Sequence, residues 1–80
     1  MTLENKASDD ATFDMTTANG RQISVTIGSG GSVGLSLTRY TAPFGIAVGS
    51  GGHSANSANV SEEATVTVSD AVEGILVDVS

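Results

Sequence analysis

Apolar and polar residues alternate at every second position in six short runs of the chain. Alternation of this kind places one face of a strand in a core and the other face in solvent. Segments rich in glycine, serine and asparagine separate the runs, and such segments are typical of turns. The sequence therefore predicts an all-β fold, a small antiparallel sandwich or barrel of about six short strands. The apolar positions are Ala11, Phe13 and Met15; Ile23, Val25 and Ile27; Val33, Leu35 and Leu37; Phe44, Ile46 and Val48; Ala64, Val66 and Val68; and Ile75, Val77 and Val79.

The first two runs predict a hairpin with a defined register. Opposed residues on an antiparallel pair share a face, so Phe13 should lie opposite Val25. In the same register Met15 lies opposite Ile23, and a three-residue loop remains at residues 18–20. The last residue of such a loop adopts the left-handed conformation, which glycine reaches without steric cost. Gly20 occupies that position, so register and turn chemistry agree.

The first ten residues show no alternation that would bury a face, and four of them are charged. We interpret residues 1–10 as a flexible N-terminal arm that precedes a single β domain at residues 11–80. If each connection simply reverses the chain, the arm and the glycine-rich segments 28–32 and 49–59 emerge at one end of the sheet. Long loops are tolerated mainly where they bind partners or are disordered. This end is predicted to face a partner through Gly28, Ser29, Gly30, Gly31, Gly51, Gly52 and His53.

A chain of 80 residues has little capacity for a core of its own. By the scaling of surface with mass, its folded surface should be about 4,400 Å², and folding should bury roughly 60% of the unfolded surface. No cysteine is present to add a disulfide. We therefore expect the chain to associate with copies of itself or with a larger partner.

The charge balance excludes several classes of partner. The chain carries three basic residues and nine acidic ones, a formal net charge of −6. Binding to phosphates requires a basic surface, so neither nucleic acid nor an anionic membrane is expected as a partner. No run of about 18 apolar residues predicts a membrane helix, and the first twenty residues lack the pattern of a secretory signal. We expect synthesis in the cytoplasm.

No arrangement of residues in the sequence identifies an enzyme. Residues 30–34 match the G-x-S-x-G spacing of a serine nucleophile at Ser32, but that motif needs a following helix, and a strand is predicted there. The only histidine, His53, has no second nitrogen or thiolate for a zinc site. We therefore predict no catalytic residue, no metal site and no cofactor.

Two interpretations of the acidic residues stay open. Loop carboxylates could hold calcium weakly, although the spacing of an EF-hand is absent. The preferred interpretation is a solvated acidic surface that keeps copies from pairing edge to edge. The residues concerned are Asp9, Asp10, Asp14, Glu62 and Glu63.

Three segments in the second half of the chain share a recognisable order. They are FGIAV at residues 44–48, EEATVTV at 62–68 and VEGILVDV at 72–79. The order begins with a Gly-Ile-Ala strand and a polar loop. An acidic residue then opens a valine-rich strand, and a Val-x-Gly-Ile-Leu strand closes the order. In this order, over about residues 32–79, the chain resembles the small decoration (cement) proteins of tailed phages.

The resemblance implies a non-enzymatic virion protein that binds the outer surface of an assembled capsid and stabilises the shell. Its partners would be the major capsid protein and copies of itself, often in a homotrimer. Synthesis would take place in the host cytoplasm, and the final location would be the outer capsid surface. In this reading the N-terminal arm orders on the shell. The expected capsid contacts are Thr2, Leu3, Glu4, Asn5 and Lys6.

An extracellular β adhesin or carbohydrate-binding module is the alternative function. Sugar binding usually depends on exposed aromatic side chains. Phe13, Tyr40 and Phe44 are the only aromatic residues of the chain. The small number of aromatic residues is the main argument against this alternative.

Overall fold

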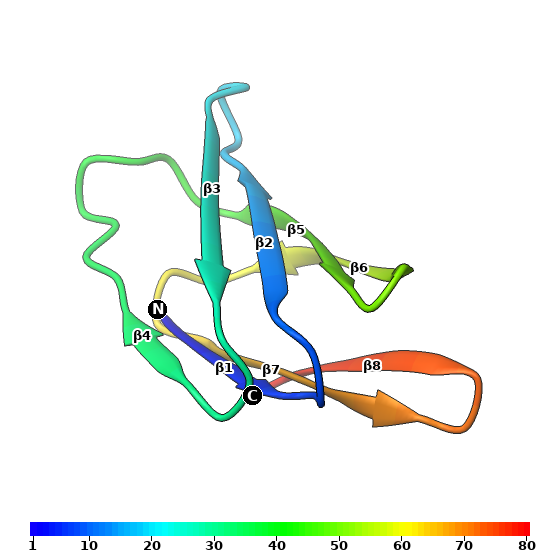
Figure 1. Cartoon of the computed structure of the whole chain (residues 1–80). Coiled ribbons are helices and arrows are strands. Elements are labelled where there is room, and N and C mark those ends of the chain that lie inside the picture. Colours follow the sequence, from blue (N-terminus) through cyan, green and yellow to red (C-terminus); the bar gives the residue numbers. More distant parts are fainter.

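Two four-stranded β-sheets pack face to face in the computed structural model, which describes residues 1–80 (Figure 1). The β1 sheet has the strand order β4-β1-β7-β8, and the β2 sheet has the order β3-β2-β5-β6. The predicted all-β sandwich is confirmed, with eight strands in place of about six. The strands are β1 (Thr2–Lys6), β2 (Ala11–Thr16), β3 (Gln22–Ile27), β4 (Ser32–Gly34), β5 (Phe44–Ser50), β6 (His53–Val60), β7 (Thr65–Ala71) and β8 (Gly74–Val79).

Strands β2 and β3 form the predicted hairpin. Phe13 lies opposite Val25, and Met15 lies opposite Ile23. The N–H of Thr17 donates to the carbonyl of Arg21 at 2.8 Å and closes the three-residue loop. Gly20 ends that loop with a φ of +87°. The register and the turn derived from the sequence are both confirmed.

The N-terminal segment is an integral strand, so the prediction of a flexible arm at residues 1–10 was wrong. Strand β1 lies between β4 and β7, antiparallel to the first and parallel to the second. Leu3 is fully buried, and Asn5 is 1% exposed. The inward positions of this strand thus hold one leucine and one asparagine. Because asparagine is polar, the alternation of hydrophobicity is invisible, and the domain begins before residue 11.

The segment at residues 49–59 was also predicted wrongly, as a long loop. Strand β5 continues to Ser50, and β6 begins at His53 after a turn of two glycines. The inward side chains of β6 include the half-buried Ala55 and Ser57, which are too small or too polar to mark a strand. The third predicted strand is correspondingly short, because β4 ends at Gly34. Leu37 lies in the loop beyond it and is nevertheless buried.

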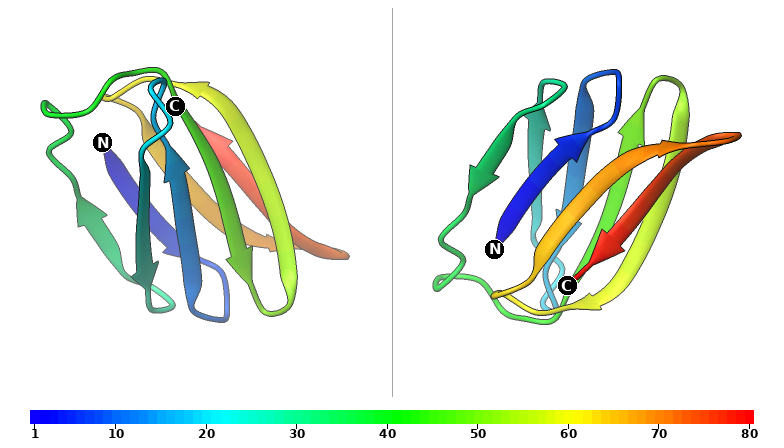
Figure 2. Two further views of the ribbon diagram at one scale, coloured as in Figure 1. Left: turned by 90° about the horizontal axis from the view of Figure 1, so that it is seen from above. Right: turned by 90° about the horizontal axis from the view of Figure 1, so that it is seen from below.

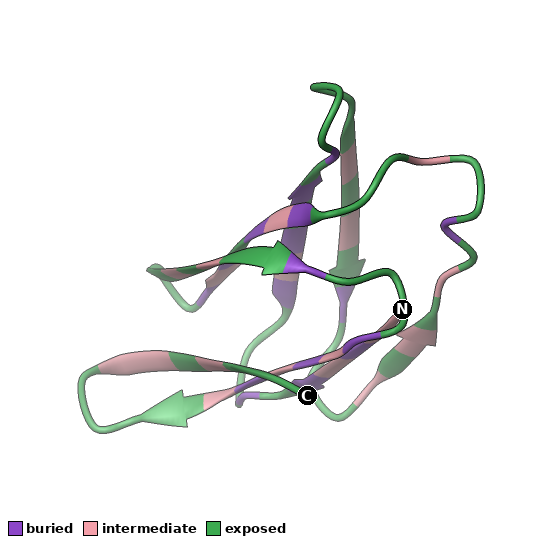
Figure 3. Cartoon of the chain, turned by 180° about the vertical axis from the view of Figure 1, so that it is seen from behind, coloured by how far each residue is buried: buried purple, intermediate pink, exposed green.

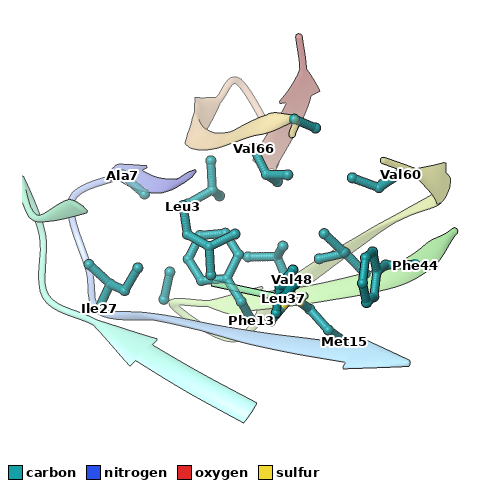
Figure 4. Packing of buried hydrophobic residues seen from close by; sticks show 14 residues of the cluster. Leu3, Ala7, Phe13, Met15, Ile27, Leu37, Phe44, Val48, Val60 and Val66 are labelled. Atoms are coloured by element: carbon teal, nitrogen blue, oxygen red, sulfur yellow. The ribbon is translucent and has the colours of Figure 1, made fainter. Parts of the chain in front are cut away.

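The core fills the space between the two sheets, as the labelled side chains in Figure 4 show. Figure 3 shows the buried positions concentrated on β1, β2, β5 and β7, which are inner strands of their sheets. The accessible surface is 4542 Å², close to the value expected from the mass. Several inward residues of the edge strands are only partly buried, among them Ile23 and Val25 on β3 and Ile75 and Val77 on β8. The buried apolar residues are Leu3, Ala7, Ala11, Phe13, Met15, Ile27, Leu37, Phe44, Ile46, Val48, Val60, Ala64, Val66 and Val68.

Candidate partner-binding end of the sandwich

Four connections between strands lie toward one end of the sandwich (Figure 2). We call this region the turn end. It consists of the β1–β2 loop, the β3–β4 turn, the β5–β6 turn and the β7–β8 turn, at residues 7–10, 28–31, 51–52 and 72–73. The glycine segments predicted to emerge together therefore do so. The segment preceding residue 11 joins them as a closed loop between two strands.

The side chain of Asn5 joins two of these connections. Its Nδ2 donates to the carbonyls of Asp9 and Ile27, both at 2.9 Å. Its Oδ1 accepts from the N–H of Ala7 at 2.9 Å. The backbone N–H and C=O of Asn5 also pair with the β3–β4 turn at 2.9 and 2.8 Å. Because a buried amide is costly unless it is hydrogen-bonded, this set of bonds fixes both connections.

Two serine hydroxyls add further links to the β1–β2 loop. Oγ of Ser29 donates to the carbonyl of Ala7 at 2.6 Å, and Oγ of Ser50 donates to the carbonyl of Asp9 at 3.3 Å. The β5–β6 turn approaches the same loop closely. A Cβ atom at residue 51 would lie 2.6 Å from Oδ2 of Asp9, and the φ of +58° at Gly51 favours glycine. The β1–β2 loop is therefore held in one arrangement by bonds from β1, the β3–β4 turn and β5.

The β7 strand is linked to the turn end through Ser8 and Asp70. Oγ of Ser8 donates to Oδ2 of Asp70 at 2.7 Å, and the N–H of Ser8 lies 3.2 Å from each carboxylate oxygen. The hydroxyl bond, and then the backbone bond, lower the pKa of Asp70 below its ordinary value of 3.8. The ionised carboxylate thus stabilises the link between the two elements.

We expect Asp70→Asn to weaken the dependence of stability on pH. A carboxyl whose pKa is lower in the folded chain than in the unfolded chain adds stability above the unfolded value. That contribution disappears as the pH falls through the folded pKa. Urea unfolding near neutral pH and below pH 3.8 measures it. Asp70→Asn should lose a little stability only at the higher pH, and Glu62→Gln serves as an exposed control. An equal loss at both values would contradict this assignment.

The acidic residues considered for calcium are dispersed over the molecule. Asp9 and Asp10 lie at the turn end, whereas Asp14 lies on the outer face of β2 and accepts from Oγ of Ser24 at 2.7 Å. Glu62 and Glu63 follow β6 and lie at the opposite end. No three histidine, aspartate or glutamate side chains are placed to hold a metal ion. The carboxylates considered for calcium therefore do not converge on one place.

The residues predicted as capsid contacts fall into two groups. Leu3 and Asn5 are buried between the sheets, so they cannot contact a partner without unfolding. Thr2, Glu4 and Lys6 alternate with them and lie on the outer face of the β1 sheet. The prediction is therefore wrong for the two buried residues. By contrast, the predicted residues of the β3–β4 and β5–β6 turns lie together at the turn end.

The residues of the hydrolase hypothesis are far apart. Ser32 lies on β4, one edge of the β1 sheet. His53 lies beside Gly74 of β8, the opposite edge strand, where a Cβ on that glycine would be 3.4 Å from Nδ1. Three strand spacings separate the two edges, about 14 Å. Ser32 and His53 therefore do not form a nucleophile and base pair.

A shallow hollow lies on the outer face of the β2 sheet, with a volume of about 390 Å³. Its floor includes Gly45 and Ala47, which have little or no side chain at outward positions of β5. No aromatic side chain lines it. The two phenylalanines are fully buried in the core, and Tyr40 packs partly against the core. The hollow is lined by Asp14, Thr16, Gln22, Gly45, Ile46, Ala47, Asn56 and Ser57.

Comparisons with known proteins add no assignment. No family model, curated protein or solved structure matches the chain. The structure also contains no helix with the length and apolar character needed to cross a membrane.

Proposed function

We propose that the chain is a non-enzymatic virion protein that binds the outer surface of a phage capsid and stabilises the shell. The observation that carries this proposal is the turn end, a polar surface held in one arrangement by the bonds of Asn5, Ser29, Ser50 and Ser8. Preorganised surfaces lose less conformational entropy on binding. The resemblance to decoration proteins, in segments that form β5, β7 and β8, supplies the identity of the partner.

The charge of the turn end indicates the kind of surface that it contacts. Asp9, Asp10, Asp70 and Glu73 lie on its connections or at their bases, and they outnumber the basic residues there, Lys6 and His53. An acidic surface favours a basic patch on the partner, and added salt weakens such an attraction. Many copies on one shell would add avidity, so a small interface for each copy would suffice.

Binding to empty expanded shells of the phage that encodes the chain tests the proposal. The double variant Asp10→Lys with Glu73→Lys reverses two charges at the turn end. The matched control, Glu62→Lys with Glu63→Lys, makes the same change of charge at the opposite end. All four residues are exposed, so both variants should remain folded. We expect co-sedimentation with shells to be lost for the first variant and retained for the control.

Two results would contradict the proposal. Absence of binding by the unmodified chain at low salt would remove the capsid as the partner. Equal binding by the two double variants would remove the turn end as the contact surface. Circular dichroism of both variants establishes that each is folded before binding is compared.

A carbohydrate-binding module is the second candidate, and the hollow on the β2 sheet is the observation in its favour. Its lining offers a carboxylate, hydroxyls and amides that could bond to sugar hydroxyls. Sugar rings usually stack on aromatic side chains, and none is available there. The capsid function is therefore the one that we propose.

A further inference from the structure

The exposed large hydrophobic side chains of the chain are confined to the β7–β8 hairpin. They are Val72 at 102% exposure, Leu76 at 58% and Val79 at 37%. Strand β8 is an edge strand whose only hydrogen-bonded neighbour is β7, and it lies close to β6 of the facing sheet. Exposed apolar side chains that are confined to one edge hairpin mark a candidate site of association.

The hydrogen-bonding pattern shows which backbone groups of β8 are free. Thr65 and Ser80 exchange both N–H···O bonds at 2.9 Å. In an antiparallel ladder such pairs alternate with pairs that share no bond. Leu76 and Asp78 therefore bond to β7, at the register positions opposite Ser69 and Thr67. The N–H and C=O groups of Ile75, Val77 and Val79 consequently point to the open edge.

The other sheet edges carry features that oppose pairing. Strand β4 has only three residues, and the ladder of β6 is interrupted by a bulge next to Asn59, whose φ is +56°. Strand β3 exposes polar side chains at alternate positions. Strand β8 has six residues, with no proline, no lysine and no bulge, and its single charge is Asp78. Proteins use such features to prevent edge pairing, and β8 lacks nearly all of them.

We propose that β8 pairs with β8 of a second copy of this chain, antiparallel and about a two-fold axis at Leu76. This arrangement joins the two β1 sheets into one eight-stranded sheet. It differs from the threefold association implied by the resemblance. It also does not depend on the capsid function, because it rests only on the exposed edge.

The register follows from the free backbone groups and the side chains. Pairing must place the residues with free N–H and C=O groups in one copy opposite the same kind of residues in the other. An axis at Leu76 does so, because it places Ile75 of each copy opposite Val77 of the other. The two exposed Leu76 side chains then lie opposite each other at the axis. Their pair shares no hydrogen bond, so it is of the closely spaced kind. An axis at Asp78 would oppose two carboxylates, and an axis at Val77 would set Leu76 against Asp78.

Light scattering of the purified chain over a range of concentrations tests the proposal. The mass should rise from 8.0 kDa toward twice that value, and added salt should favour the dimer because each copy carries a net charge of −6. Leu76→Lys should weaken association by at least about tenfold, equivalent to roughly 1.4 kcal/mol. Ala47→Lys, on the exposed outer face of the other sheet, should associate like the unmodified chain.

Val77→Pro separates strand pairing from a simple apolar contact. Proline there removes an N–H that points to the open edge and leaves the bonds to β7 in place. We expect a folded monomer, with folding checked by circular dichroism. If the proline variant does not fold, Leu76→Lys still tests whether β8 forms the dimer contact, through the Leu76 side chains at the axis. A monomer at every concentration, a mass of three times 8.0 kDa, or a dimer unaffected by Leu76→Lys would overturn the proposal.

Discussion

Deletion of residues 1–10 should abolish cooperative folding. The deletion removes β1 from between β4 and β7, and it removes Leu3 from the core. Loss of a buried leucine side chain alone costs about 2–5 kcal/mol, and small domains have only about 5–15 kcal/mol of stability in total. The backbone partners of the strand would also be left without bonds. Urea titration followed by circular dichroism should therefore show no cooperative transition in the deleted chain.

Point variants of the intact chain calibrate this result. Leu3→Ala should lower the free energy of unfolding by about 2–5 kcal/mol, because the side chain is fully buried. Lys6→Ala, on the exposed outer face of the same strand, should change it by about 0.5 kcal/mol or less. A deleted chain that unfolds at the same urea concentration as the intact one would show that the segment is a dispensable arm.

Asn5→Ala should also have a large effect, a loss of about 2–4 kcal/mol in the free energy of unfolding. The substitution removes both bonds to the carbonyls of Asp9 and Ile27 and the acceptor for the N–H of Ala7. Those backbone groups lie in or beside the core, so leaving them without hydrogen-bond partners lowers the stability of the folded chain. Equilibrium unfolding in urea measures the difference.

Asn56→Ala is the matched control, because Asn56 is exposed on the outer face of β6. Its effect should stay within about 0.5 kcal/mol. If Asn5→Ala were equally mild, Asn5 would not be the residue that holds the β1–β2 loop and the β3–β4 turn together. In that case, Asn5→Ala should also bind shells as well as the unmodified chain does, when binding is measured under conditions in which both are folded.

The strands that the sequence predicted are those whose buried positions are apolar. Phe13 and Met15 on β2, and Val66 and Val68 on β7, alternate with polar residues and identify their strands without any knowledge of the fold. The β2–β3 register followed from the same alternation together with the glycine that its turn requires. For these strands the local pattern was sufficient, whereas the equally apolar run at residues 33–37 forms a strand only as far as Gly34.

The two missed strands show where local pattern fails. The inward positions of β1 include Asn5, and those of β6 include Ala55 and Ser57. Asn5 is stable in the core only because backbone groups form hydrogen bonds with it. Ala55 and Ser57 lie on a strand only because that strand pairs with β5. That information resides in the tertiary structure. Pairing of β1 with β7 also joins residues about sixty positions apart, which no local pattern indicates.

The position of the turn end was predicted from the sequence, but the hydrogen bonds that hold it were not. Reversal of chain direction at each connection was sufficient to bring the glycine segments together. The bonds from Asn5 and the link between Ser8 and Asp70 could not be predicted, because polar residues in loops carry no periodic signal. The resulting surface is more rigid than an arm that orders on contact. This difference moves the proposed capsid contact from the N-terminal residues to the turns.

Hydrogen exchange of the intact chain tests the integration of β1 most directly. The N–H of Asn5 donates to the carbonyl of Gly31 at 2.9 Å and lies on a strand paired on both sides. Its amide should therefore exchange only through global unfolding, with the same opening free energy as the amides of the central strand β7. Exchange of the Asn5 amide at the rate of an unstructured peptide, while β7 stays protected, would contradict the account.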